Sequence, residues 1–283
     1  SYGGVPILHR VNYSSILDPD KVSSFLRNEA KEAKVVTMVH CETPSGTLNN
    51  LKELAKAVKS EGKLLVVDAV SSMGGVDIDV KWGIDILIGG SQKVLNLPSG
   101  LTILAISDDA WSEIEKVGYR GFYLNIRYWR DAVEKMEFPY THSESLVNGL
   151  VESLKMINEE GLSNVYGRHR AISRGVIKAV ESIGLRLVPD SEEYSSPTVT
   201  AFYAPNGVSE AKVRELALKY GAFIAGSWGP LRGKVLRIGH MGYTASLSIM
   251  TSTLTALAKA LNDSGHRVKV GDAIDAFLNG VSA

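Results

Sequence analysis

The stretch that decides the fold is Ile84–Asn96, which reads IDILIGGSQKVLN. Its first five residues form an apolar run, interrupted only by Asp85, that is typical of a buried strand. Small residues then lead to Lys93, which has apolar rather than charged neighbours. A lysine placed in this way lies where its amine can lose its hydration and become nucleophilic.

A carboxylate upstream of this lysine is the second informative residue. Asp68 ends the apolar run Leu64–Val67 and precedes the turn-rich segment Ala69–Gly75. We therefore expect Asp68 and Lys93 to leave neighbouring strand ends together, an arrangement that suits pyridoxal phosphate. The carboxylate would keep the ring nitrogen protonated, and the protonated ring is the electron sink that stabilises a carbanion at the substrate's α-carbon. The simpler alternatives are a surface lysine after a strand and a carboxylate that caps a turn.

Length, charge and cysteine content narrow the class of protein. The 283 residues can form one large domain or two smaller ones, and we expect two. Basic and acidic residues number 31 each, without long blocks of one sign, so no nucleic-acid partner and no membrane surface are indicated. Cys41 is the only cysteine, which excludes an internal disulfide and favours a reducing, cytoplasmic setting. No apolar run is long enough for a membrane helix, and no signal segment is recognisable.

The order of apolar runs predicts an α/β fold. In the first half, strand-like runs alternate with helical patterns, which favours a mostly parallel sheet covered by helices on both faces. We place a large domain with its linking helix at residues 1–162 and a smaller C-terminal α/β domain at residues 163–283. The predicted strands are residues 35–39, 64–68, 85–88, 101–107, 198–204 and 234–238. One predicted helix begins at Asp18, and a long one includes residues 165–183. The other predicted helices are residues 49–61, 143–160, 209–220 and, last in the chain, 246–261.

Aromatic side chains are concentrated after the predicted large sheet. Aromatic residues at this density usually mark an interface or the wall of a substrate pocket. The cluster consists of Tyr119, Phe122, Tyr123, Tyr128 and Trp129.

The loop His40–Thr47 (HCETPSGT) follows the first predicted strand of the sheet, at the edge where ligands bind in open α/β sheets. Thr43 could hydrogen-bond the ring oxygen of the cofactor, and Gly46 would allow close backbone approach. An ordinary turn with a helix cap stays open as the alternative. We expect Cys41 to be a buried packing residue rather than a nucleophile, and His40 to be structural.

Arg237 is a charged residue inside an apolar strand pattern, and such a charge requires a partner. Its planar guanidinium matches a carboxylate in two hydrogen bonds, which suits an amino-acid or oxo-acid substrate. Gly239 and Gly242 leave space nearby. An internal ion pair is the alternative.

With Lys93, Asp68 and Arg237 together, the chain resembles the class V, fold-type I pyridoxal-phosphate aminotransferases. It is most similar to the alanine:glyoxylate, serine:pyruvate and serine:glyoxylate group, and the resemblance extends over essentially the whole chain. It implies the fold-type I architecture, with pyridoxal phosphate as cofactor. The motifs that carry it are Glu42–Thr47, Val67–Gly75, Gly83–Asp85, Gly90–Asn96 and Lys234–Gly239.

The resemblance implies a role for each matching residue. Lys93 would be the Schiff-base lysine, Asp68 the partner of the ring nitrogen and Gln92 a phosphate contact. Thr43 would contact the ring hydroxyl, and Arg237 the substrate carboxylate.

In this family the cofactor phosphate is also held by a tyrosine and a threonine from the second subunit of a dimer, so the resemblance implies a homodimer. Thr141 matches the threonine. Phe138 stands at the position of the tyrosine, with Tyr140 close by as a substitute.

The activity that the resemblance implies is transamination of a small amino acid, of the alanine or serine type, with a small 2-oxo acid such as glyoxylate or pyruvate. A cysteine desulfurase would need a reactive cysteine on a loop well after the lysine, whereas Cys41 precedes it. A nicotinamide-dependent dehydrogenase would need a Gly-x-Gly-x-x-Gly motif after a first strand, and the chain has none.

The beginning of the chain departs from the family pattern. The family's N-terminal segment supplies a small-residue loop for the phosphate and an aromatic residue that stacks on the ring, and nothing before Tyr2 matches it. The chain opens at Ser1 in what reads as a strand, so we expect it to start inside a domain, with residues omitted from this sequence. The alternative from another class is a truncated or cofactor-free binding or assembly module.

Overall fold

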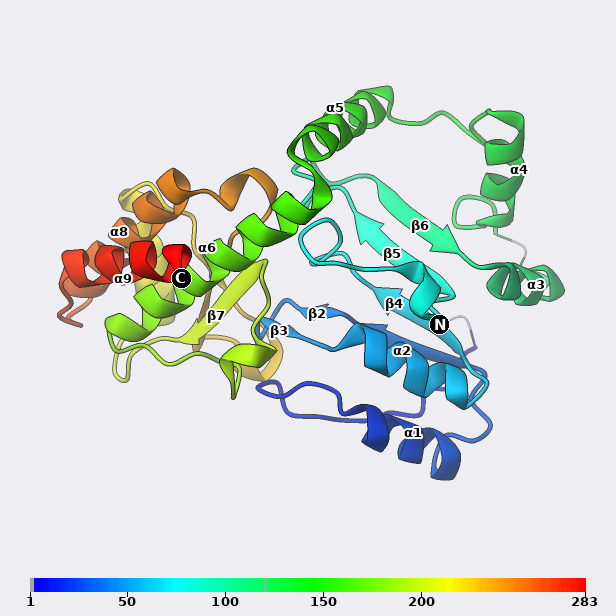
Figure 1. The fold of residues 1–283 in the computed structure, drawn as a ribbon, viewed down its shortest axis with the longest axis horizontal. Coiled ribbons are helices and arrows are strands. Elements are labelled where there is room, and N and C mark those ends of the chain that lie inside the picture. Colours follow the sequence, from blue (N-terminus) through cyan, green and yellow to red (C-terminus); the bar gives the residue numbers. More distant parts are fainter. Residues whose placement is uncertain (1–2, 120) are drawn as a thin grey trace.

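The computed structural model describes residues 3–119 and 121–283. Figure 1 shows two groups of elements, with helix α6 (Leu162–Ser182) leading from one to the other. The two larger hydrophobic cores among the described residues follow this arrangement: one lies between Val22 and Leu87 in the sequence, and the larger one between Ile172 and Phe277. A small third cluster is formed by Val188, Ala201, Leu231 and Val235. The domain boundary after residue 162 falls at the start of α6 and stays a prediction.

The larger sheet confirms the predicted α/β fold with a mostly parallel sheet. β4 is parallel to β1 and to β5, whereas β6 is antiparallel to β5. The register pairs Asp68 with Val39 on one side and with Ile88 on the other, so the carboxyl ends of the parallel strands meet at one edge. In spatial order the strands are β1 (Val35–Val39), β4 (Leu64–Asp68), β5 (Ile86–Gly90) and β6 (Thr102–Ile106).

Helices α1 (Pro19–Asn28) and α2 (Leu51–Ser60) pack against each other beside this sheet. The Asp18 carboxylate caps α1 by accepting hydrogen bonds from the amides of Asp20 and Lys21, which have no partner inside the helix. The predicted apolar stripe of α2 is buried, and it consists of Leu51, Leu54, Ala55 and Val58.

The second group of elements is built on a small antiparallel sheet with the order β7-β9-β8. Phe202 and Leu236 face each other in adjacent strands and are fully buried, which places the sheet against the larger core. Its elements are β7 (Val199–Tyr203), α7 (Glu210–Lys219), β8 (Ala225–Gly226), β9 (Val235–Gly239), α8 (Leu247–Asp263) and α9 (Val270–Ser282).

Helix α9 corrects the prediction that the helix beginning near residue 246 is the last. Gly271 and Gly280 weaken the helical pattern of α9 in the sequence. In the fold, α9 packs on α6, and a Cβ at Gly280 would lie 2.9 Å from the Cα of Gly175. The helix is thus stabilised by a close crossing of two helices, which a local pattern does not reveal.

The opening of the chain is also different from the prediction. Residues 3–12 form no strand, and the strand predicted at the start is wrong for the residues that the structure describes; Ser1 and Tyr2 lie outside them. The remaining elements are β2 (Cys41–Glu42), β3 (Thr47–Leu48), α3 (Asp108–Lys116), α4 (Arg127–Lys135) and α5 (Glu144–Glu160).

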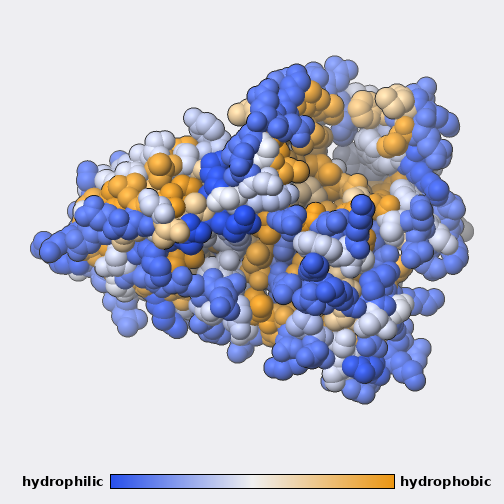
Figure 2. All heavy atoms as spheres, in the orientation of Figure 1, coloured by the Kyte–Doolittle hydropathy of each residue, from blue (hydrophilic) through white to orange (hydrophobic). Residues whose placement is uncertain are grey.

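The surface carries apolar side chains over α4 and α5, as Figure 2 shows. Val133 on α4 is 71% exposed and Met156 on α5 is 62% exposed. Within the described residues, no helix has the length and apolar character needed to cross a membrane.

Candidate active site

Lys93 lies in the loop that leaves β5. Buried Ser91 shapes this loop, because its hydroxyl donates to the carbonyl of Pro98 at 2.8 Å and accepts from the amide of Leu101 at 3.2 Å. The amide of Asn96 closes the turn by donating to the carbonyl of Lys93 at 3.0 Å. Hydrogen bonds on both sides of Lys93 thus fix the backbone of the loop that carries it.

Glycines at the end of β5 bring the segment after Asp68 close to the lysine loop. A Cβ at Gly90 would lie 3.1 Å from a methyl carbon of Val70, and a Cβ at Gly89 would overlap the side chain of Met73. A larger residue at either position would require the Val70 or Met73 side chain to shift. The turn that follows Asp68 therefore packs directly on the strand that leads to Lys93.

The electrostatic surroundings of Lys93 favour its neutral form. Burial lowers the pKa of the Lys93 amine, and the charge of Arg237 lowers it further, whereas Cys41 and Asp68 act in the opposite direction. These groups act on the amine because the fold brings Arg237, Cys41 and Asp68 close to Lys93. A half-buried lysine with a lowered pKa is a better nucleophile at neutral pH than a surface lysine.

Asp68 points out of the sheet edge and is exposed. One of its carboxylate oxygens accepts a hydrogen bond from the amide of Val70 at 2.9 Å. Asp68 therefore does cap the turn, as the simpler alternative proposed, but through the amide of Val70 and not through Ser71 or Ser72. Among the described residues, the second oxygen of Asp68 has no hydrogen bond. Burial and the charge of Asp68 raise the pKa of Glu42, which lies nearby.

The hairpin formed by β2 and β3 links the turn after Asp68 to the second sheet. The hydroxyl of Thr43 lies 2.6 Å from the hydroxyl of Ser71, and the carbonyl of Thr43 accepts a hydrogen bond from Arg237 at 3.1 Å. Gly46 adopts a φ of 68°, and a Cβ there would lie 3.0 Å from the backbone nitrogen of Ala201. The close approach predicted at this glycine is made to β7.

Arg237 projects from β9 and is half-buried. Its Nε donates to the carbonyl of Gly226 at 2.8 Å, and its guanidinium carbon lies 4.5 Å from the centre of the Trp228 ring. Burial lowers its pKa. The described residues provide no carboxylate that pairs with it, so the internal ion pair considered as the alternative is not formed within them. A cation in this state is suited to binding a carboxylate from a ligand.

His40 and Cys41 are buried and play the structural roles expected of them. Ser72 holds Nδ1 of His40 at 2.9 Å, and burial lowers the pKa of this histidine to about 4, so the ring is neutral. The thiol of Cys41 donates to the hydroxyl of Ser196 at 3.1 Å, and burial raises its pKa. A thiol with a raised pKa is a poor nucleophile.

Three residues predicted for the phosphate lie apart from these contacts or on the surface. Gln92 is exposed next to Lys93. The hydroxyl of Tyr140 accepts from the indole of Trp129 at 3.0 Å and donates to the carbonyl of Tyr123 at 3.3 Å. Thr141 is exposed beside it. Within one chain, Tyr140 is thus part of the aromatic cluster rather than of the Lys93 surroundings.

Sequence reasoning missed Trp228, which stacks on the substrate-binding candidate Arg237. Nothing in the spacing of the two residues indicates this contact. It follows from the pairing of β8 with β9, which sets Ala225 opposite Arg237 and leaves Trp228 shortly after the strand. The available signal in the sequence was a tryptophan between two small residues, Ser227 and Gly229.

A cavity of about 1330 Å³ lies between the N-terminal residues and the strands β1 and β4. Glu42 and Asp68 line it, but Lys93 and Arg237 do not. Of the residues Lys93, Asp68 and Arg237, only Asp68 therefore contacts the cavity, so the cavity is not the substrate site.

The donor set fits pyridoxal phosphate, the cofactor that the sequence resemblance implies. Lys93 offers an amine with a lowered pKa, Asp68 a carboxylate with one oxygen that accepts no hydrogen bond from residues 3–119 and 121–283, and Thr43 a hydroxyl close to the same turn. These are the groups that an aldehyde carbon, a ring nitrogen and a ring oxygen require. No group of three or more histidine, cysteine, aspartate or glutamate side chains within residues 3–119 and 121–283 is arranged to hold a metal ion.

Comparisons with known proteins agree on one family. The family model described as Aminotransferase class-V matches residues 7–230. The chain is 36% identical over 280 residues to the pyridoxamine–pyruvate transaminase of Mesorhizobium japonicum, which covers 96% of this chain and 70% of that protein. It is 36% identical over 268 residues to the serine–glyoxylate aminotransferase of Methylorubrum extorquens, covering 91% of this chain and 66% of that protein.

A solved structure agrees with these sequence matches. The crystal structure of pyridoxamine–pyruvate aminotransferase from Mesorhizobium loti has a TM-score of 0.92 with this chain at 35% identity. The match covers 96% of this chain and 70% of that one. The chain thus spans about two thirds of the length of these relatives.

Proposed function

The chain belongs to the class-V aminotransferases, and we propose that it transfers the amino group of a small amino acid to a small 2-oxo acid with pyridoxal phosphate as cofactor. The donor would be of the alanine or serine type, and the acceptor glyoxylate or pyruvate. Relatives are named for serine with glyoxylate and for pyridoxamine with pyruvate, and a solved structure at 28% identity is named for alanine with glyoxylate. The observation that carries the proposal is the half-buried Lys93 amine in the loop after β5, whose pKa is lowered by burial and by the charge of Arg237.

The cofactor would be held by residues on both sides of the sheet edge. Lys93 would bind its aldehyde carbon covalently, Asp68 would keep a proton on the ring nitrogen, and Thr43 would bind the ring oxygen. Gln92 would contact the phosphate. Bound there, pyridoxal phosphate would supply the electron sink that stabilises negative charge at the substrate's α-carbon.

The proton transfer would be the work of Lys93. With the substrate in place, the Nζ atom of Lys93 would take the proton from the α-carbon. A lowered pKa means that a larger fraction of this amine is neutral at pH 7 than for an ordinary lysine, as a general base requires. Arg237 would bind the carboxylate of donor and acceptor alike, because both substrates carry that group.

We also propose that the protein is a homodimer in which Tyr140 and Thr141 contact the cofactor phosphate of the second copy. The aromatic cluster supports this, since its Phe122 is 58% exposed, and Phe138, whose ring lies 6.1 Å from that of Trp129, is 56% exposed. An exposed apolar surface of this kind usually marks a site where another protein chain binds. The buried, unpaired Cys41 supports a reducing, cytoplasmic setting.

The proposal is tested by a panel of donors and acceptors offered to the cofactor-loaded protein. Alanine or serine with glyoxylate or pyruvate should give turnover, and Lys93→Ala should lower kcat by about a hundredfold or more, since general-base catalysis contributes that much. Lys81→Ala, which removes an exposed lysine from the preceding loop, is the matched control and should keep full activity. Normal turnover in Lys93→Ala would overturn the assignment.

A further inference from the structure

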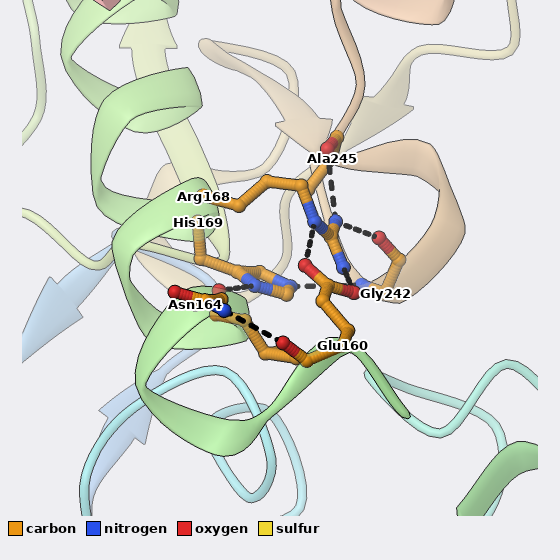
Figure 3. Close-up of polar contacts among 7 residues, drawn as sticks. Glu160, Asn164, Arg168, His169, Gly242 and Ala245 are labelled. Carbon is orange, nitrogen blue, oxygen red and sulfur yellow. Dashed lines mark hydrogen bonds and ion pairs between the residues drawn. The ribbon is translucent and has the colours of Figure 1, made fainter. Parts of the chain in front are cut away.

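The loop formed by residues 241–245 (loop 241–245) joins strand β9, which carries Arg237, to helix α8. An arginine from α6 holds it. Arg168 donates from Nη1 to the carbonyl of Gly242 at 2.7 Å and to the carbonyl of Ala245 at 2.9 Å, as Figure 3 shows. Both ends of the loop are thus fixed by one guanidinium group.

The guanidinium is itself oriented by Glu160 at the end of α5. Its Nε and Nη2 atoms donate to the two carboxylate oxygens at 2.6 and 2.8 Å, which is the bidentate geometry of a strong ion pair. Gly161, with a φ of 84°, makes the bend between α5 and α6 that turns Glu160 back toward Arg168. The hydrogen bond from Arg168 lowers the pKa of Glu160.

The neighbouring residue of α6 binds the same loop. Nε2 of the fully buried His169 accepts a hydrogen bond from the amide of Gly242 at 2.9 Å. Nδ1 must then carry the proton, because it faces the carbonyl of Val165 at 2.7 Å. Burial lowers the pKa of His169, which favours the neutral ring that this acceptor role requires.

The opposite side of loop 241–245 touches the loop that carries Lys93. Gly242 has a φ of 56°, and a Cβ there would overlap the carbonyl oxygen of Val94. The side-chain amide of Asn96 lies between the carbonyl of Met241 and the backbone amide of Tyr243. It is oriented so that its nitrogen donates to the carbonyl and its oxygen accepts from the backbone amide. Loop 241–245 is therefore packed between Arg168 and the residues that directly follow Lys93.

Helix α5 also reaches the lysine loop. The hydroxyl of Ser153 donates to the carbonyl of Leu95 at 2.7 Å. The helix that supplies Glu160 therefore contacts the lysine loop directly, and through Arg168 it contacts loop 241–245. Helices α5 and α6, joined at Gly161, thus contact both loops.

We propose that Arg168, oriented by Glu160, is a positioning residue that holds the Arg237-bearing strand in register with the Lys93 loop through the carbonyls of Gly242 and Ala245. The proposal rests on the proposed function, because it assigns these two loops to one site. Arg168 is given no contact with substrate or cofactor.

A consequence for Lys93 follows from the charges that face it. These are Arg237, Cys41 and Asp68. If loop 241–245 is released, water reaches the amine and Arg237 moves away from it. Both changes raise the pKa of Lys93 toward that of an ordinary lysine.

The test is the pH profile of Lys93 acylation by acetic anhydride in the intact, cofactor-free protein, read by peptide mass spectrometry. Arg168→Ala should move the midpoint upward by about half a unit or more, which leaves about threefold less neutral amine below the midpoint. Lys178→Ala is the matched control: it removes an exposed cation of the same helix that pairs with Glu181 and Glu192, and its midpoint should equal that of the parent.

A second readout shows whether the variants keep their fold. Hydrogen exchange should become faster in residues 93–97 and 241–245 of Arg168→Ala and stay unchanged in α2. Should that variant fail to fold, Glu160→Gln decides the point with a smaller upward shift of the Lys93 midpoint.

The proposal is overturned if the Lys93 midpoint of a folded Arg168→Ala or Glu160→Gln variant stays where it is in the parent. It is also overturned if Lys178→Ala shifts the midpoint as much. The acylation profile does not depend on amino transfer, so a parent protein without transaminase activity would contradict the proposed function and leave this result standing on its own.

Discussion

Loop 241–245 and the segment 121–142, which includes helix α4, are held by different contacts. Loop 241–245 is bound by Arg168 and His169 and packed against the loop of Lys93. In the segment 121–142, Tyr140 bonds to Trp129 and to the Tyr123 carbonyl, inside the segment itself, and large aromatic faces remain exposed. The first region is thus held by contacts within one chain, whereas the exposed rings of the second are suited to contact another chain.

The largest effect is expected at the residue that ties the first region to the substrate. Arg237→Ala should raise the KM for alanine and for glyoxylate by about 10- to 100-fold, since hydrogen bonds to charged groups contribute roughly 1.5–3 kcal/mol. Steady-state kinetics measure this change. Arg186→Ala is the matched control, because Arg186 also stacks on an aromatic ring, that of Tyr203, in the same sheet. An equal rise in KM in both variants would mean that Arg237 does not bind the substrate carboxylate.

A smaller effect is expected where loop 241–245 meets the lysine loop. Gly242→Ala should lower the free energy of unfolding by about 1–3 kcal/mol, because the new methyl group meets the Val94 carbonyl and the positive φ disfavours alanine. Chemical denaturation measures it. Gly239→Ala, at a glycine with open space around it and an ordinary φ, should change stability far less. Equal losses in the two variants would mean that the contact with Val94 is not tight.

The smallest effect on folding is expected in the segment 121–142. Phe122→Ser should change the free energy of unfolding of the isolated chain by about 0.5 kcal/mol or less, since the ring is mostly exposed. It should nevertheless weaken self-association, which sedimentation velocity would detect. Phe223→Ser, at an 85% exposed ring in the other group of elements, should leave association unchanged. An unaltered association of Phe122→Ser would place the dimer contact elsewhere.

The sequence predicted the elements whose signals are local. The runs at residues 35–39 and 64–68 are strands with those bounds, because an apolar run between polar turns has few alternatives. The approach of Asp68 to Lys93 was predictable for a similar reason, since parallel strands deliver their ends to one edge. Helix α9 was missed because its stability depends on Gly175 of another helix.

The parts of the site that could not be predicted depend on contacts between distant segments. The hydrogen bond from Arg237 to the carbonyl of Thr43 joins residues far apart in the chain, and the stacking of Trp228 depends on how β8 pairs with β9. Arg168 gave no signal because its acceptors are backbone carbonyls, which every residue has. Such contacts arise only once the fold has assembled.

The most direct test of the central claim is to reduce the pyridoxal-phosphate-loaded protein with borohydride and to locate the resulting mass label by peptide mapping. We expect the label to lie on the peptide that contains Lys93, and the Lys93→Ala protein to carry no label. A label on another lysine, or an unchanged label in that variant, would contradict this claim.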